Sequence, residues 1–190
     1  MQPLRPLAPG DWVIESSLAG VFLHEDFVYG AAQPVPGVRY GLVPNLELRG
    51  HVMPALLLSS IAGFDAGLVW HGPRVDQVQF HGSADVLVLV DPFNRPAALR
   101  GAFNARATAH WEATATVWPF ASIDGAVAFD DGDFIPAAGI GTQFQLDPWE
   151  LSIEARLGAW DERTLDFSQP YLGVAGRGVL YGGLGIGYRL

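Results

Sequence analysis

Apolar and polar residues alternate with a period of two along most of the sequence, most clearly in the segment WELSIEARLGAW at residues 149–160. One parity of this segment is apolar throughout, whereas the other carries Glu150, Glu154 and Arg156. Because successive side chains of a β-strand point to opposite faces of a sheet, the segment is predicted to be a strand with one apolar and one polar face. The apolar face lies either inside a soluble sandwich or barrel, or outside a barrel that is surrounded by lipid.

Segments of this kind recur about ten times along the chain. Eight strands are the alternative count, because ALLL at residues 55–58 interrupts the alternation. Short and long connections alternate: the predicted tight turns are residues 43–45, 71–74, 119–122 and 147–148, and the predicted longer connections are residues 24–36, 91–105, 130–136 and 161–170. This arrangement is typical of an antiparallel up-and-down barrel. We therefore predict an all-β fold with a single barrel domain over residues 1–190, in which residues 1–10 form an N-terminal extension.

The composition limits the classes of protein that the sequence can belong to. Charged residues make up 16% of the chain, which is below the roughly 25% of ordinary soluble domains. The net charge of −9 and the lack of a cationic cluster argue against binding to nucleic acid. No apolar run approaches the length of about 20 residues that a membrane helix needs. The N-terminus has no apolar segment of the kind found in signal peptides, so an exported protein would be a mature chain from which that peptide has been removed.

The placement of aromatic residues favours lipid on the apolar side of the strands. Rings on that parity lie near predicted strand ends, where membrane barrels carry aromatic girdles at the two interfaces. The polar parity mixes charges with Gly, Ala, Ser and Thr, which suit a narrow lumen. The sequence therefore predicts a transmembrane barrel, in which Trp70, Trp111, Ile153 and Ile186 point outward and Arg49, His110, Glu154 and Arg156 point inward.

Two stretches resemble known outer-membrane proteins. The C-terminal segment GGLGIGYRL at residues 182–190 is similar to the terminal assembly signal of bacterial outer-membrane barrels, with Gly185, Tyr188 and Leu190 at the matching positions. It differs in ending in Leu where that signal has Phe, and in lacking a polar residue at position 183. GVRYGLVPNLELRG at residues 37–50 and GFDAGLVW at residues 63–70 resemble the hairpins of porin-like and transporter-like barrels, including the phenol-degradation-pathway outer-membrane family. The resemblance implies a location in the bacterial outer membrane and contact with the barrel-assembly machinery.

Charged residues gather on the parity that we predict to face the lumen. They are Glu15, Arg39, Glu47, Arg49, His51, Asp65, His71, His81, Asp85, His110, Glu112, Asp124, Glu150, Glu154, Arg156, Arg177 and Arg189. In a narrow barrel such residues form a core of ion pairs, because buried charges need partners. The alternative is a permeation path whose charge sets selectivity. Glu47 and Arg49, like Glu154 and Arg156, are neighbours on one strand face, so we expect opposite charges to pair locally and to occlude the lumen.

The sequence offers only weak signals for catalysis or for metal binding. His110 and Glu112 in HWE lie on one face of a strand and would serve a membrane-embedded lipid hydrolase as a catalytic pair. No Ser lies in that strand to act as the nucleophile. The acidic run DDGD at residues 130–133 resembles part of a calcium loop but lacks the later bidentate Glu. We therefore expect no catalytic residues, no metal and no cofactor.

The function that these features favour is a small, non-enzymatic outer-membrane barrel that serves as an anchoring or scaffold component, or as a narrow channel with a charge-filled lumen. The alternatives are the lipid hydrolase and a soluble, lipocalin-like barrel with an apolar interior for its ligand. The expected partners are outer-membrane lipid, lipopolysaccharide, the assembly machinery and an envelope protein of unknown identity; nucleic acid is not among them.

Overall fold

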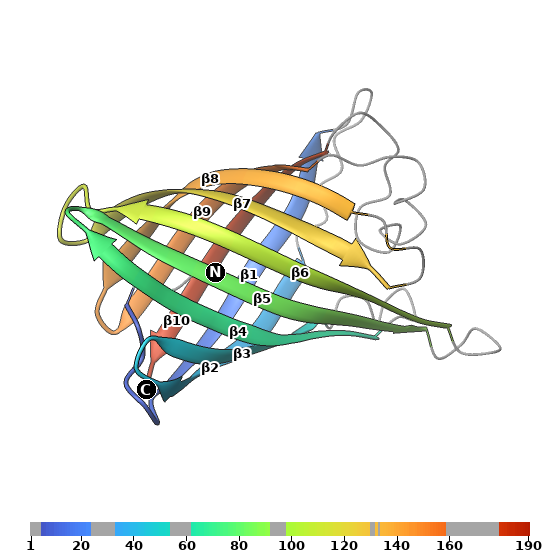
Figure 1. Ribbon diagram of the computed structural model, residues 1–190, viewed down its shortest axis with the longest axis horizontal. Helices are drawn as coiled ribbons and strands as arrows, with labels where there is room; N and C mark the ends of the chain where they lie inside the picture. Colours follow the sequence, from blue (N-terminus) through green and yellow to red (C-terminus); the bar gives the residue numbers. More distant parts are fainter. Residues whose placement is uncertain are drawn as a thin grey trace.

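Ten antiparallel strands form a closed barrel in the computed structural model (Figure 1). The structure describes residues 5–23, 33–53, 62–91, 98–129, 132, 134–158 and 179–190. The strands are β1 (Trp12–Leu23), β2 (Gln33–Val43), β3 (Leu46–Met53), β4 (Ala62–Val75), β5 (Val78–Asp91), β6 (Ala98–Trp111), β7 (Val117–Ala128), β8 (Phe134–Leu146), β9 (Trp149–Gly158) and β10 (Val179–Arg189). The predicted fold class is confirmed, and the strand count is ten instead of the alternative of eight.

Each strand pairs with its neighbours in the sequence, and the first strand pairs with the last. The closing ladder between β1 and β10 runs from Val13 opposite Arg189 to Leu18 opposite Leu184 and beyond. Closure leaves no strand edge with unpaired backbone groups, which is the condition that a sheet must meet within hydrocarbon. The pairing is therefore compatible with a membrane on all sides of the barrel.

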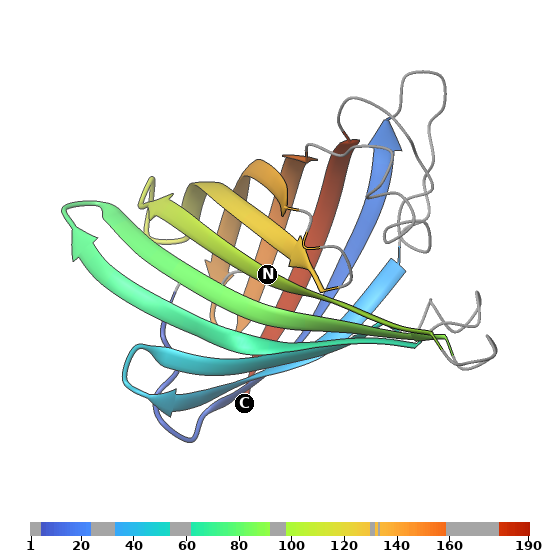
Figure 2. The same cartoon turned by 45° about the vertical axis from the view of Figure 1, so that its right-hand side comes forward.

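The short turns lie together at one end of the barrel, on the left in Figure 1. We call this the turn end, and the opposite end the loop end. Figure 2 shows the strands tilted around the barrel between these two ends. At the turn end, Asn45 and Asp76 adopt left-handed backbone conformations with φ of 67° and 52°. Asn and Asp tolerate this conformation in tight hairpins better than other side chains do.

Two of the four predicted tight turns are wrong. Residues 71–74 continue β4, and the chain turns later, at residues 76–77. The irregular register between His71 and Arg74 allows the strand to accommodate Pro73, which cannot donate a ladder hydrogen bond. Residues 119–122 lie within β7, because the preceding turn spans residues 112–116, where the Val117 N–H donates to Thr114 Oγ1 at 3.0 Å. Alternation in EATAT resembled a strand although these residues form the turn.

Three of the predicted long connections extend too far along the chain, because the next strand begins before the predicted loop ends. Strands β2, β6 and β8 begin at Gln33, Ala98 and Phe134, within segments that we predicted to be loops. Pro and Gly in these segments suggested connections, but strands near a barrel rim tolerate both residues. The interrupted stretch ALLL at residues 55–58 and most of DDGD at residues 130–133 lie outside the described residues.

The outer surface is apolar and the interior is polar, the reverse of a soluble domain. Ile123 and Ile140 are 68% and 67% exposed, whereas Arg39 and Glu47 are completely buried. All four residues predicted to point outward are exposed on the outer surface: Trp70, Trp111, Ile153 and Ile186. Surface patches this apolar are stable only against lipid or against another apolar surface. The described residues include no helix long and apolar enough to cross a membrane.

The N-terminal extension, of which residues 5–10 are described, packs against the turn end of the barrel. The Gly10 N–H donates to the Gly41 carbonyl at 2.9 Å, and the Gly41 N–H donates to the Asp11 carbonyl at 3.0 Å. A Cβ on Gly41 would lie only 2.1 Å from the carbonyl oxygen of Ala8, so this close approach requires glycine. Leu7 is consequently 2% exposed and forms part of the core inside the barrel.

Replacing Ile153 by Arg tests the outward orientation of β9. Ile153 lies in the middle of the strand and is 53% exposed. If it faces hydrocarbon, Ile153→Arg lowers the free energy of unfolding by about 2–4 kcal/mol in reversible denaturant titrations from lipid vesicles. The control Ile153→Leu preserves the apolar surface and leaves this free energy nearly unchanged. An Arg variant as stable as the wild type would contradict the lipid-facing assignment.

Candidate functional site

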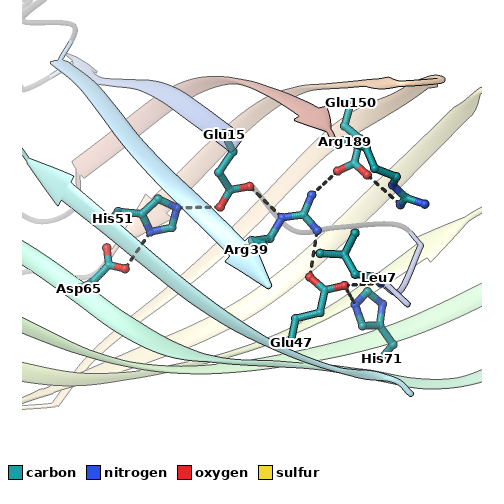
Figure 3. Close-up of polar contacts among 9 residues, drawn as sticks. All are labelled: Leu7, Glu15, Arg39, Glu47, His51, Asp65, His71, Glu150 and Arg189. Atoms are coloured by element: carbon teal, nitrogen blue, oxygen red, sulfur yellow. Dashed lines mark hydrogen bonds and ion pairs between the residues drawn. The ribbon is translucent and has the colours of Figure 1, made fainter. Parts of the chain in front are cut away.

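The centre of the lumen is occupied by one arginine that binds three carboxylates (Figure 3). Arg39 Nε donates to Glu15 Oε2 at 3.0 Å, its Nη1 donates to Glu47 Oε2 at 3.0 Å, and its Nη2 donates to Glu150 Oε2 at 2.5 Å. All four side chains are at most 2% exposed. Such complete burial is tolerable only because the guanidinium distributes its donors over all three acceptors.

Gly187 on β10 lies between two of these carboxylates. It is opposite Glu15 on β1 and opposite Glu150 on β9, so that it separates the two carboxylates along the wall. A Cβ on Gly187 would make ordinary contacts with Glu15 Cβ at 3.8 Å and Glu150 Cβ at 3.7 Å, and a tighter one of 3.3 Å with Val13 Cγ1. Arg39 extends across the lumen from β2 to reach Glu150 on β9.

Two histidines extend the Arg39 network. His51 Nε2 lies 2.8 Å from Glu15 Oε1, and its Nδ1 lies 2.7 Å from Asp65 Oδ1. An imidazole held between two carboxylates satisfies both only when each nitrogen carries a proton. His71 Nε2 lies 2.8 Å from Glu47 Oε1, which also accepts the Leu7 N–H at 2.9 Å. Glu47 thus connects the N-terminal extension to the centre of the barrel.

A row of rings covers the opposite part of the wall. His71, His81, His110 and Phe120 come from β4, β5, β6 and β7, and their successive ring centroids are 4.9, 4.8 and 5.0 Å apart. The Nδ1 atoms of His71 and His81 are 3.1 Å apart, close enough for one hydrogen bond between the rings. The row fills the width of the lumen that the Arg39 network leaves.

Together these groups close the barrel. Every strand but β10, which contributes the buried Gly187, supplies at least one side chain that is at most 3% exposed to a layer near the turn end. We call this layer the sealed layer, and it consists of Val13, Glu15, Arg39, Glu47, Val69, His71, His81, His110, Phe120, Gln143 and Glu150. Side chains this completely buried leave no passage the width of a hydrated ion. The lumen is therefore occluded near the turn end.

A second group of charges lies between the sealed layer and the loop end. Arg49 Nη2 is 2.5 Å from Asp85 Oδ2, Arg106 binds Glu154, and Arg156 binds Asp124. These side chains are more exposed than those of the sealed layer, and that of Arg156 reaches 33%. We call Arg49, Asp85, Arg106, Asp124, Glu154 and Arg156 the loop-end cluster.

The structure brings together most of the residues predicted to face the lumen, and one of the two predicted pairs forms. Glu47 binds Arg39 across the barrel, where we had expected it to pair with Arg49 on its own strand. Glu154 pairs with Arg156, with 3.6 Å between Glu154 Oε1 and Arg156 Nε, and it also binds Arg106 from β6. Alternation along one strand does not reveal such cross-strand partners, because register and strand curvature decide which side chains of different strands meet.

Two of the predicted lumen residues, Glu112 and Arg177, do not belong to the lumen network that the structure describes. Glu112 follows the end of β6 at the turn end and binds Arg74, in an ion pair whose side chains are 30% and 48% exposed. It therefore lies outside the lumen network, and the structure does not bring it together with His110. Arg177 lies outside the described residues. Within the described part of the chain, no group of three or more His, Asp or Glu side chains is placed to hold a metal ion.

Several lumen residues were missing from the sequence prediction. Arg106 has the parity of His110 on β6, so continued alternation could have identified it. Phe120 and Trp118 were missed because residues 119–122 resembled a turn. Leu7 lies in an extension that has no strand pattern, and nothing in the local sequence indicates that it is buried.

Comparison with a solved porin supports the fold. The NanC porin matches with a TM-score of 0.51 and 8% identity, over 94% of this chain and 100% of the porin. A chain from the de novo design of transmembrane β-barrels matches with a TM-score of 0.40 and 13% identity, over 98% of this chain and 100% of its own. At 8% identity the similarity to the porin concerns the barrel fold alone. No protein-family model and no curated protein matches the sequence, so the resemblance to the phenol-degradation-pathway family stays a prediction.

Removing the central guanidinium tests the importance of the Arg39 network. Arg39→Met leaves three buried carboxylates without their shared partner, so the free energy of unfolding falls by about 3–5 kcal/mol. The control Arg74→Met breaks the exposed pair with Glu112 and lowers it by at most about 1 kcal/mol. Denaturant titrations of both variants in lipid vesicles measure the difference. Equal losses for the two variants would show that the central network is not a stabilising core.

Proposed function

We propose that the protein is a membrane-spanning barrel of the bacterial outer-membrane type, closed to ions and solutes, that acts as an anchor or scaffold in the envelope. The observation that carries this proposal is the sealed layer, in which Arg39 and its partners fill the lumen of a barrel whose outer surface is apolar. Barrels that leave a water-filled channel are wider, as in porins of 16–18 strands.

The outer surface supports the membrane part of the proposal. Its exposed residues are large and apolar on every strand from β1 to β10, for example Ile14, Phe64, Ile123 and Leu184. Trp12 contacts Tyr40, and Trp149 contacts Tyr188, in ring pairs near the turn end. Aromatic side chains favour the boundary between hydrocarbon and headgroups, which supports a position of the turn end near one membrane interface.

The occluded lumen favours an anchor over a channel. The carboxylates of the sealed layer are bound by Arg39, by Arg189 or by histidines, and therefore present no free charge to a passing ion. Opposite charges in the loop-end cluster are likewise paired across strands instead of being segregated on two walls. This arrangement does not produce a transverse electric field across the lumen like that of a general porin.

The two alternatives have less support. A lipid hydrolase based on His110 and Glu112 needs those side chains in contact, whereas one is buried in the sealed layer and the other binds Arg74. A lipocalin-like carrier needs an apolar interior, whereas the described interior is dominated by charged and amide side chains. Neither activity is therefore part of the proposal.

Insertion would use the C-terminal strand. In β10, Tyr188 and Leu190 are on the outer surface with exposures of 39% and 67%, and Gly185 is on the inner face. This strand pairs with β1 to close the barrel, so its recognition by the assembly machinery would precede closure. Outer-membrane lipid and lipopolysaccharide are the surroundings that we propose for the finished barrel.

Planar-bilayer recordings on the purified protein test the closed lumen. The wild-type barrel gives no stable conductance steps. Arg39→Ala removes the side chain that fills the centre and leaves three carboxylates facing the gap, so it gives cation-selective steps. The control Arg74→Ala stays silent, because Arg74 lies outside the sealed layer. Folding of each variant is checked by the resistance of the barrel to detergent unfolding. Large, stable steps in the wild type would contradict the proposal.

A further inference from the structure

Three histidines are buried side by side in the sealed layer, and we call them the histidine row. His71, His81 and His110 come from β4, β5 and β6, and each is at most 2% exposed. Successive ring centroids lie 4.9 and 4.8 Å apart, with the ring planes nearly perpendicular at 81° and 88°. The row therefore closes its part of the lumen only as long as the three rings stay in contact.

The contact between His71 and His81 holds a single proton. Figure 3 shows His71 directed at Glu47, whose Oε1 lies 2.8 Å from His71 Nε2. A carboxylate only accepts hydrogen bonds, so this nitrogen carries a proton. The Nδ1 atoms of the two histidines are 3.1 Å apart, and a hydrogen bond between them needs one donor and one acceptor. If both rings became imidazolium ions, two N–H groups would face each other and this hydrogen bond would be lost.

The polar neighbours of the row can compensate one positive charge on it. Within the described residues, Glu47 is the carboxylate that pairs with the row, and it does so through His71. The other oxygen of Glu47 is bound to Arg39. His81 lies between its two histidine neighbours, and His110 has the uncharged amide of Gln143 as its hydrogen-bonding neighbour. A second charge on the row would therefore be buried without a counterion, which is strongly unfavourable.

The ionised groups of the surrounding strands do not provide that counterion, because they are already paired. These groups are Arg39 with Glu15, Glu47 and Glu150, His51 with Glu15 and Asp65, Arg49 with Asp85, Arg74 with Glu112, Arg106 with Glu154, Arg156 with Asp124 and Glu154, and Arg189 with Glu150. The positive charge of Arg106 also acts on His110, from the same face of β6. On β7 the row meets the uncharged ring of Phe120.

Water at the turn end is only a few residues from the row. Strands β4 and β5 are joined at residues 76–77, and His110 is the last residue but one of β6. Rings that separate in this region can reach water, where an ordinary imidazole takes up a proton below about pH 6.5. Acid therefore favours separated, charged rings over the packed row.

We propose that the histidine row is an acid-sensitive gate in the sealed layer. Near neutral pH the packed rings close the lumen; in acid the row takes up further protons, its rings separate and the layer opens. Because imidazolium ions and Arg106 line the gap, it passes small anions in preference to cations. This inference rests on the proposed function, since a gate of this kind requires a barrel that is closed at neutral pH.

Planar-bilayer recordings at two pH values test the gate. The wild-type barrel is silent at about pH 7.5 and gives anion-selective steps at about pH 5, which disappear when the pH is raised again. His81→Phe keeps a ring in the middle of the row but cannot take up a proton, so it is silent under both conditions. His81→Asn, whose amide can still donate to His71, is a second variant without a titratable group and is silent as well.

The matched control is Thr108→Val, which changes the residue opposite His81 on β6 and leaves every histidine in place. It retains the acid-induced steps. Resistance to detergent unfolding shows that each variant is folded, so that silence reports a closed lumen.

Three results overturn the proposal: a wild-type barrel that stays silent in acid, acid-induced steps in folded His81→Phe or His81→Asn protein, and steps that persist after the return to neutral pH. The recordings also separate this failure from that of the proposed function. Steps in the wild type at neutral pH mean that the lumen is open, whereas silence under both conditions means that the barrel is closed and the histidine row is not a gate.

Discussion

The binding of three carboxylates by the Arg39 guanidinium is the interaction on which the interior of the barrel depends. Each ion would be strongly destabilised if it were buried alone, and together they form a compact group that needs no water. The partners come from β1, β3 and β9, so the group forms only when the strands are paired in the correct register around a closed barrel. The network therefore contributes to the specificity of the fold as well as to its stability.

Closing a barrel around such large side chains requires compensation elsewhere on the inner face. Gly41 admits the N-terminal extension, and Gly141 admits the ring of Phe120. Glycine in a strand is normally destabilising because it has no side chain to pack. In this barrel its lack of a side chain is the reason that the N-terminal extension and the ring of Phe120 fit in the narrow lumen.

The sequence predicted the orientation of side chains more reliably than their partners. Alternation is a local property, so the outward position of Ile153 and the inward position of Glu154 follow from the pleat alone. Glu154 binds Arg106, three strands away, in addition to Arg156 on its own strand, and the contact with Arg106 depends on register and curvature, which the local pattern does not contain. Two turn predictions were wrong because Pro73 and Pro119 resemble turn residues although both lie within strands. Pro119 is paired in the ladder with Thr142, and Pro73 lies in the irregular part of β4 between the paired residues His71 and Arg74.

The central claim is that the apolar face of the sheet contacts lipid and the polar face lines the lumen. Two tryptophans report on it directly, because Trp70 is 52% exposed on the outer surface and Trp118 is 8% exposed on the inner face. Single-tryptophan proteins retaining one or the other, with the remaining tryptophans replaced by Phe, are reconstituted in vesicles of brominated lipid. The account predicts strong fluorescence quenching of Trp70 and little quenching of Trp118. Equal quenching of both, or quenching of Trp118 alone, would contradict it.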